Sequence, residues 1–355
     1  MANTDYPVNH PLAVKLWSEK LFREALYQTE AAKFMSSGQD SVFQMLNDTA
    51  KGAGDKITYG LRMQLTGDGV TGDSTLEGNE EALTTYSDSI LIDQVRHAVK
   101  SNGKMSEQRV KFDVREEAMM GLADWWAGRI DTSLFNQLGG NTAQSNTAYT
   151  GNNATVAPSS TRIYYANAVA NETQVISASS SNVFKLKFID YAVERARTAT
   201  PLIRPVKVNG EDKFVLFLHE YQVTDLRVDA STAGNWFDIQ GKALQGGAGS
   251  KSPIYTGALG EYNNVIIHRS KRVPFVTSNA GGAAYRAIFC GAQAGTVAFG
   301  QNYSGVEGQK WVEKAFDYGN QLGVSSSLIW GAKKSIFNSV DFGTIVISAY
   351  AGAHT

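Results

Sequence analysis

The stretch DVREEAMMGLADWWAGRIDTSLFNQLG, from Asp113 to Gly139, is the strongest secondary-structure signal in the sequence. Asp113 is a suitable N-cap, acidic residues follow in the positive first turn, and a Gly-Gly pair ends the pattern. An apolar residue recurs at every fourth position, as on one face of an α-helix. These residues are Val114, Ala118, Leu122, Trp126, Ile130, Leu134 and Leu138. Such a helix is roughly 40 Å long, so we expect it to pack on an equally long surface such as a β-sheet.

Upstream of this helix the sequence predicts a long β-hairpin. Two β-like runs, 57–65 and 83–92, flank the polar, glycine-rich tip TGDGVTGDSTLEGNEEA. The first run alternates apolar and polar residues, which is typical of a strand. The hairpin has too little apolar surface to form a domain, so we expect an arm that reaches away from the body.

The hairpin also carries charge of one sign only. Every charged residue between Met63 and Val95 is acidic: Asp68, Asp73, Glu77, Glu80, Glu81, Asp88 and Asp93. A solvated acidic loop is the default interpretation. A calcium loop fits less well, because the spacing differs from that of a helix–loop–helix site. The third interpretation is docking on a basic surface of another subunit, either Arg269, Lys271 and Arg272, or Lys185 and Lys187.

The rest of the chain predicts helices first and mostly strands later. Residues 11–35 predict an amphipathic helix, which packs either on its own domain or on a neighbouring subunit. No charged residue occurs between Asp131 and Arg162, which predicts a long surface excursion. Residues 183–199 predict another helix. Strands are expected at 213–219, 264–268, 287–291, 296–299, 321–330 and 343–349. This order is typical of an α+β fold.

Composition excludes several classes of protein. The 355 residues have a formal net charge of −1, so the basic excess of a nucleic-acid-binding protein is absent, and contact with DNA should be local and weak. The single cysteine, Cys290, lies in an apolar run and reads as a buried, inert thiol. The sequence shows no signal peptide and no run long enough to span a membrane. We expect folding in a reducing cytoplasm.

The sequence shows no catalytic or cofactor-binding motif. Its five histidines are scattered and lack the paired spacing of a metal site, and His219 and His268 read as structural residues. No nucleophile elbow and no phosphate-binding loop occur. The basic run from His268 to Arg272 is too short to indicate a nucleic-acid patch. We therefore expect no catalytic residue, no metal and no cofactor.

Several segments together resemble a known family. They are YPVNHPLAVKLWSEKLFREAL, KGAGDKITYGLRMQLTGDGVTGDSTLEGNEEALTTYSD, LFLHEYQVTDLR, GALGEYNNVIIHRSKRVP, AIFCGAQAGTVAFGQ and FDYGNQLGVSSSLIWGAKKSIFNSVDFGTIVISAYA. In number, length and order they resemble the major capsid proteins of tailed bacteriophages, in the branch typified by coliphage N-four, the enquatrovirus type. The resemblance covers most of the chain apart from roughly 140–182 and part of 225–250.

This resemblance implies the α+β Hong Kong 97-like capsid fold, also called the Johnson fold. Its parts would be an N-terminal arm at 1–50, an extended loop at 51–104, a peripheral domain with the long spine helix and an insertion at 105–182, an axial domain at 183–300, and C-terminal strands of the peripheral domain at 301–355. Those last strands would lie beneath the spine helix. With about fifty residues before the extended loop, we expect no N-terminal scaffolding segment, so the resemblance implies that scaffolding comes from a separate protein.

The implied function is that of a non-enzymatic shell subunit of the virion, assembled in the host bacterial cytoplasm. Its partners would be further copies of itself in hexamers and pentamers, a scaffolding protein in trans, the portal protein, a decoration protein as a further candidate, and packaged double-stranded DNA by weak, non-specific contact. No membrane partner is expected. The alternatives are another phage structural protein and an α+β enzyme.

Overall fold

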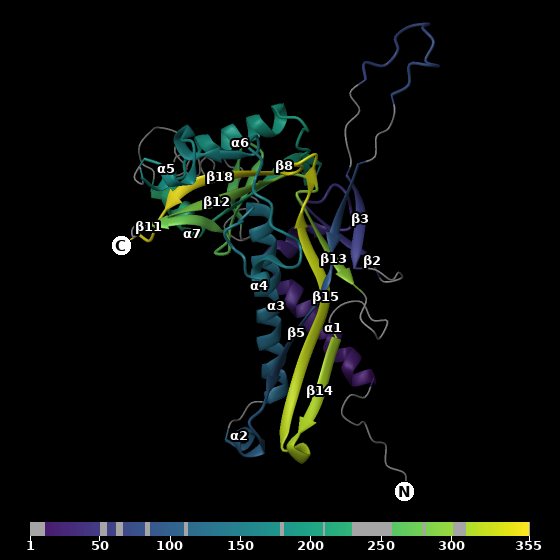
Figure 1. Ribbon diagram of the computed structural model, residues 1–355, viewed down its shortest axis with the longest axis vertical. Coiled ribbons are helices and arrows are strands. Elements are labelled where there is room, and N and C mark those ends of the chain that lie inside the picture. The colour runs from purple at the N-terminus through teal and green to yellow at the C-terminus, as the bar shows by residue number, and fades with distance from the viewer. Residues whose placement is uncertain are drawn as a thin grey trace, which may run out of the picture.

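The computed structural model describes residues 11–49, 55–61, 67–81, 86–109, 113–177, 181–208, 210–228, 258–279, 282–300 and 310–354. Within them the chain forms two β-sheets with attached helices and one projecting hairpin (Figure 1). Parts of the predicted hairpin runs, 62–65 and 83–85, lie outside the described residues.

The predicted long helix is confirmed as α3, Val114–Gly139. The Asp113 carboxylate caps it by accepting from the backbone N–H of Arg115 at 2.8 Å. Gly140 ends it in the left-handed conformation, with φ 60°, where glycine lacks the steric penalty of other residues. The helix lies along a six-stranded sheet, the long partner that its apolar face requires. Trp126 Nε1 donates to Ser326 Oγ of that sheet at 3.0 Å.

This first sheet combines strands from both ends of the chain. Its central strand β15, Gln321–Lys334, carries β5, Asp93–Lys100, on one edge, and both β14, Lys310–Phe316, and β13, Gly295–Gly300, on the other. β2, Phe43–Thr49, and β1, Met35–Ser36, continue the sheet beyond β13. The sheet therefore joins the N-terminal, hairpin-proximal and C-terminal parts of the sequence.

The N-terminal helix is shorter than predicted. α1, Pro11–Gln28, ends well before residue 35 and is followed by the 3-10 turn η1, Ala31–Phe34. The physical reason is a competing partner, because the Asp131 carboxylate accepts from the backbone N–H groups of Glu30 and Ala31 at 2.9 and 3.1 Å. Trp17 stacks on Trp311 with ring centroids 5.7 Å apart. α1 thus packs on its own sheet.

The second sheet has eight strands, in the order β6-β18-β12-β8-β10-β9 with β11 and β7 at its margins. The bounds are β6 Ile163–Tyr165, β7 Val206–Val208, β8 Glu211–Leu218, β9 Ala258–Tyr262, β10 Val265–Arg269, β11 Phe275–Asn279, β12 Gly282–Cys290 and β18 Thr344–Ala351. The helices α5, Glu172–Ser177, α6, Lys187–Thr198, and α7, Glu220–Val228, accompany it (Figure 1).

The two sheets share one core at their junction. Phe217 of β8 lies against Phe34, Phe43 and Phe135, with ring centroids 5.2 to 6.2 Å apart. Arg286 of β12 donates to the carbonyls of Gly139 and Gly140 at the end of α3. The second sheet and its helices, called the second body below, are therefore joined to the end of the long helix by direct hydrogen bonds.

Chain divisions predicted from the sequence differ from the observed strand pairing in three places. We expected every strand after about residue 301 to lie beneath the long helix, which is right for β15 and wrong for β18. β18 pairs with β12 and β6 in the second sheet. β13 belongs to the first sheet, although it falls within the range 183–300, and β5 does too, although it falls within 51–104. The periodicity of a strand predicts its exposed and buried faces but not its pairing partner.

The uncharged stretch after α3 is more than a surface excursion. After the short helix α4, Thr147–Thr150, Asn153 is buried and bonds both the N–H and the C=O of Leu91 at 2.9 Å. Gln137 of α3 donates to the Asn153 carbonyl at 2.6 Å. Lys334 Nζ donates to the Val156 carbonyl at 3.0 Å. This segment connects the hairpin base to the long helix and the first sheet through hydrogen bonds.

The hairpin strands are β3, Lys56–Leu61, and β4, Tyr86–Leu91, which form the hairpin base and pack on the body. The tip, residues 67–81, projects beyond the body at the top of the view (Figure 1). The turn between β14 and β15 lies at the opposite end, beside the short helix α2, Lys104–Gln108. The small strands β16, Ile336–Phe337, and β17, Val340–Asp341, complete the described elements near the hairpin base.

Candidate intersubunit contact sites

The hairpin tip presents its charges entirely to solvent. Asp68, Asp73, Glu77, Glu80 and Glu81 are all exposed. Glu81 and Glu80 also accept backbone N–H groups of the tip, from Gly67 at 2.7 Å and from Gly78 at 2.8 Å. The apolar Leu76 is 60% exposed. The tip therefore has a local shape, a negative charge and one apolar side chain that its own chain leaves uncovered.

The acidic series found in the sequence divides into two parts. Asp88 lies in β4 at the hairpin base, where it forms an ion pair with Lys333 at 2.5 Å and accepts from Tyr59 Oη at 3.2 Å. Asp93 opens β5 and accepts from the backbone N–H of Gln94. Asp88 therefore holds the hairpin to its own sheet, whereas the five carboxylates of the tip are exposed.

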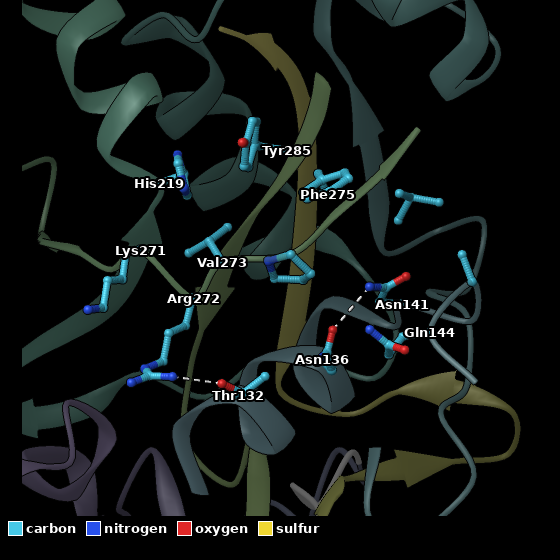
Figure 2. A pocket seen from close by; sticks show the side chains of 13 residues that line it. Thr132, Asn136, Asn141, Gln144, His219, Lys271, Arg272, Val273, Phe275 and Tyr285 are labelled. Carbon is cyan, nitrogen blue, oxygen red and sulfur yellow. Dashed lines mark hydrogen bonds between the residues drawn. The ribbon is translucent and has the colours of Figure 1, made fainter. Parts of the chain in front are cut away.

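The basic residues proposed as partners also differ in availability. Arg272 donates to the Gly128 carbonyl at 2.9 Å and to Thr132 Oγ1 at 2.8 Å, so its guanidinium is held within its own chain (Figure 2). Arg269 lies 3.8 Å from Glu220. Lys271 is exposed and, among the described residues, has no hydrogen-bond or ion-pair partner. Of this group, Lys271 is exposed without a partner among the described residues, and Arg269 is exposed with one long contact.

The second proposed pair, Lys185 and Lys187, lies beside α6. Lys187 Nζ donates to Asn167 Oδ1 at 3.0 Å and lies 5.3 Å from the Phe188 ring centroid. Lys185 is partly buried and has an interaction partner of its own. Both lysines therefore already have a partner, which makes them weaker candidates than Lys271.

A cavity of about 520 Å³ lies beside Lys271, between the end of α3 and the segment that leads into β11 (Figure 2). His219 stacks on Tyr285 in its wall, with ring centroids 4.0 Å apart. Burial lowers the His219 pKa to about 4, so the imidazole is neutral at physiological pH. The lining of the cavity contains no carboxylate and no activated nucleophile. The arrangement is that of a packed aromatic pair at a surface groove, as expected for a structural histidine.

Asp131 joins three segments at the base of the second body. Its carboxylate accepts from η1 and lies 3.9 Å from the Arg272 guanidinium. Burial raises the Asp131 pKa to about 6, although the two backbone hydrogen bonds and Arg272 oppose the shift. This joint fixes the N-terminal segment, α3 and the loop after β10 to one another, so it acts in folding and not in chemistry.

No cluster of three or more potential metal ligands occurs among the described residues. Within the same part of the chain, no helix is both long and apolar enough to cross a membrane. Sequence reasoning missed one surface, a group of four cations on the first sheet. Its members, Arg96, Lys100, Lys310 and Lys314, come from two strands far apart in the sequence, β5 and β14, and no local pattern brings them together.

Comparison with known proteins identifies the family of this chain. The family model described as "Phage capsid protein" matches residues 5–353. The major capsid protein of Pseudomonas phage KPP25 is 30% identical over 373 residues, covering 95% of this chain and 94% of that protein.

Solved capsid structures agree with this assignment. The capsid of Ralstonia phage GP4 matches with a TM-score of 0.78 and 32% identity, over 91% of this chain and 90% of the other. The cyanophage Pam1 capsid asymmetric unit matches in fold with a TM-score of 0.69 and 20% identity, over 93% and 94% of the two chains. The α+β architecture is thus the Hong Kong 97-like capsid fold predicted from the sequence. The chain belongs to the phage capsid protein family, as a major capsid protein and structural component of the icosahedral virion head rather than an enzyme.

Proposed function

We propose that subunits of this shell join by docking the acidic hairpin tip of one copy on a basic surface of the next. The observation that carries the proposal is the tip itself, which holds five exposed carboxylates and no base. The tip contributes almost nothing to its own core, so its charge and its shape are available to a neighbour. A head-to-tail contact of this kind repeats around a symmetry axis, which suits hexamers and pentamers that close into a shell around double-stranded DNA.

The electrostatic contribution of each contact is small. An exposed ion pair contributes about 0–1 kcal/mol, so no single carboxylate should be essential. In a closed shell every subunit makes the same contact. The free energies of these weak contacts add up when the geometry lets all of them form at once. The basic surface proposed from the sequence is Arg269, Lys271 and Arg272, of which Lys271 is the most available.

Finer assignments rest on sequence resemblance. We place the chain in the branch typified by coliphage N-four, on the strength of the segments quoted above. A scaffolding protein in trans, a portal protein and a decoration protein are the further partners that this branch implies. The net charge of −1 supports weak, non-specific contact with packaged DNA.

The test neutralises part of the tip without altering its length. We expect the triple variant Asp68→Asn, Asp73→Asn, Glu77→Gln to fold normally and to require about tenfold more protein for assembly, because about 1.4 kcal/mol is lost per contact. The matched control is Asp124→Asn, Asp212→Asn, Glu194→Gln, which changes three exposed carboxylates on the body. Light scattering and negative-stain microscopy measure the threshold. Equal thresholds for the two variants would contradict charge-driven docking of the tip.

A further inference from the structure

A second cavity, of about 410 Å³, lies between α3, the start of β5 and the end of β15. Three residues of α3 line it at intervals of four, Trp125, Arg129 and Ser133, so they share one face of the helix. Gln94 of β5 and Asn152 of the segment after α4 also line the cavity, and both are exposed. The cavity is therefore open to solvent beside these two residues.

The Arg129 guanidinium lies on the cavity wall without a counter-ion. Its central carbon is 5.5 Å from the ring centroid of Trp125, and His97 of β5 stacks on the same ring with centroids 4.4 Å apart. Among the described residues, the half-buried Arg129 has no hydrogen bond and no ion pair. Burial lowers the pKa of Arg129 below its ordinary value, and no carboxylate opposes the shift. Because arginine stays protonated in proteins, a partly desolvated positive charge remains unbalanced here.

Ser133, one helical turn beyond Arg129, adds an unused hydroxyl. The residue is 1% exposed, and its Oγ has no hydrogen-bond partner in the part of the chain that the structure describes. The neighbouring Thr132 hydroxyl, by contrast, donates to the Gly128 carbonyl at 2.7 Å. A buried hydroxyl without a partner is unfavourable. A ligand with an acceptor oxygen would therefore be stabilised by Ser133.

The free edge of β5 supplies a backbone donor. The Ser101 N–H donates to the Leu322 carbonyl at 2.8 Å, and in an antiparallel pair every second residue bonds the partner strand. By this alternation Gln94 and Arg96 direct their N–H groups away from β15. The Gln94 N–H donates to the Asp93 carboxylate at 2.7 Å, so this edge already holds an anionic oxygen. The next outward N–H, that of Arg96, has no partner among the described residues.

These three donors are of the kinds that proteins use for phosphate. Contacts to phosphate oxygens come from arginine, from serine hydroxyls and from backbone N–H groups, and a guanidinium can bind two oxygens at once. We propose that this cavity binds a phosphate group through Arg129, Ser133 and the backbone N–H of Arg96. The backbone of the enclosed DNA and free inorganic phosphate both present the required oxygens. The inference is independent of tip docking, and it gives the weak DNA contact proposed above a position on the subunit.

Asp93 limits the affinity of this site. It is the one carboxylate among the described residues that line the cavity, and it is exposed. No ion pair joins it to Arg129, so the guanidinium remains available, but its negative charge repels a phosphate nearby. Removal of this charge should strengthen binding, whereas removal of a donor should weaken it.

The cavity beside Lys271 lacks this arrangement. Its guanidinium belongs to Arg272, which donates to the Gly128 carbonyl and to Thr132 Oγ1. Those N–H groups are already used within the chain, whereas Arg129 has no hydrogen bond among the described residues. Of the two cavities, the one beside β5 therefore suits an oxyanion better.

Inorganic phosphate and the soluble subunit test the site. We expect phosphate, added against chloride at constant ionic strength, to bind saturably by isothermal titration calorimetry and to change tryptophan fluorescence, since Trp125 and Trp330 line the cavity. Arg129→Gln should lower the affinity roughly tenfold or more. The matched control Arg197→Gln, at an exposed arginine of α6, should change it by about twofold or less. Equal responses to phosphate and chloride, or equal affinities of the variant and its control, would overturn the inference.

Two further variants keep the test decisive if Arg129→Gln does not fold by circular dichroism. Ser133→Ala removes a neutral donor and should lower the affinity about fivefold. Asp93→Asn removes the opposing charge at an exposed position and should raise the affinity about threefold. An affinity that is unchanged in both variants would overturn the inference.

Duplex DNA distinguishes the two sources of phosphate. If the DNA backbone is the ligand, a short duplex should compete with inorganic phosphate, and Arg129→Gln should weaken DNA binding measured by fluorescence anisotropy. If free phosphate is the ligand, the duplex should leave the phosphate titration unchanged. Both results support the site. Duplex DNA that binds the native chain and Arg129→Gln equally, with no binding of inorganic phosphate, would overturn it.

The outcome is separable from that of tip docking. Arg129→Gln leaves the hairpin tip and Lys271 unchanged, so its assembly threshold without DNA should equal that of the native chain. Absence of phosphate binding would therefore contradict only the phosphate site, and equal thresholds for the tip-neutralised variant and its control would contradict only tip docking.

Discussion

The junction at the end of α3 and the hairpin tip are opposite kinds of structure. At the junction Arg286, whose side chain is 7% exposed, pairs with Glu172 at 2.6 Å and bonds the last carbonyls of α3. On the tip the carboxylates are exposed and their bonds are local. The junction is fixed by contacts within one chain, whereas the tip has almost none. We infer that the junction determines the stability of the subunit and the tip determines its association.

The largest loss of stability is expected from the buried face of α3. Trp126→Ala removes a fully buried indole and its hydrogen bond to Ser326, which should cost about 3–5 kcal/mol in the free energy of unfolding. Met120→Ala, on the exposed side of the same helix with its side chain 53% exposed, should cost about 0.5 kcal/mol or less. Urea unfolding followed by tryptophan fluorescence and circular dichroism gives both values. Similar losses for the two variants would contradict the packing described for α3.

A second comparison sets a buried ion pair against an exposed one. Arg286→Met leaves the Glu172 carboxylate and two helix carbonyls without their partner and should cost about 3 kcal/mol. Arg269→Met removes an exposed guanidinium 3.8 Å from Glu220 and should cost about 0–1 kcal/mol. Thermal unfolding of both variants at one pH measures the difference. If the two variants unfold at the same temperature, Arg286 does not hold the junction.

Asp131 should make the junction sensitive to pH. Its pKa is raised by burial from 3.8 to about 6, so the folded subunit binds a proton more tightly than the unfolded chain does. The resulting stabilisation is complete below about pH 4 and is lost as the pH rises towards 6. The stability of the native chain relative to Asp131→Asn should therefore fall by about 1–3 kcal/mol between pH 4 and pH 7. Urea unfolding of both proteins at pH 4 and pH 7 measures the difference between their free energies of unfolding. A stability of the native chain relative to Asp131→Asn that rises with pH would contradict the raised pKa.

Periodicity and capping were sufficient to predict the local elements. The four-residue apolar repeat and Asp113 predicted α3 almost to the residue, and alternation predicted the hairpin strands. The predicted end of the first helix at residue 35 was wrong. Asp131, 100 residues after Ala31, accepts from the backbone N–H groups of Glu30 and Ala31 that a longer helix would use. The prediction that β18 lies beneath α3 was wrong because strand pairing is decided by long-range packing.

The candidate site was predictable only in part. The acidic tip is continuous in the sequence, so its charge was visible there. Asp88 belonged to the same acidic run, but its partner Lys333 is 245 residues away and makes it a structural residue. Arg272 appeared available in a basic run and is held by α3. The four cations Arg96, Lys100, Lys310 and Lys314 come from β5 and β14, and only the pairing of both strands with β15 aligns them.

The most direct test of the account separates folding from assembly in one variant. Replacing Thr66–Asn79 by an Asn-Gly turn removes most of the tip while leaving β3, β4 and the Lys333–Asp88 ion pair in place. We expect the soluble subunit to unfold within about 0.5 kcal/mol of the native chain and to form no closed shells by negative-stain microscopy. A truncated subunit that unfolds, or one that assembles normal closed shells, would contradict the division between a junction that stabilises the fold and a tip that joins subunits.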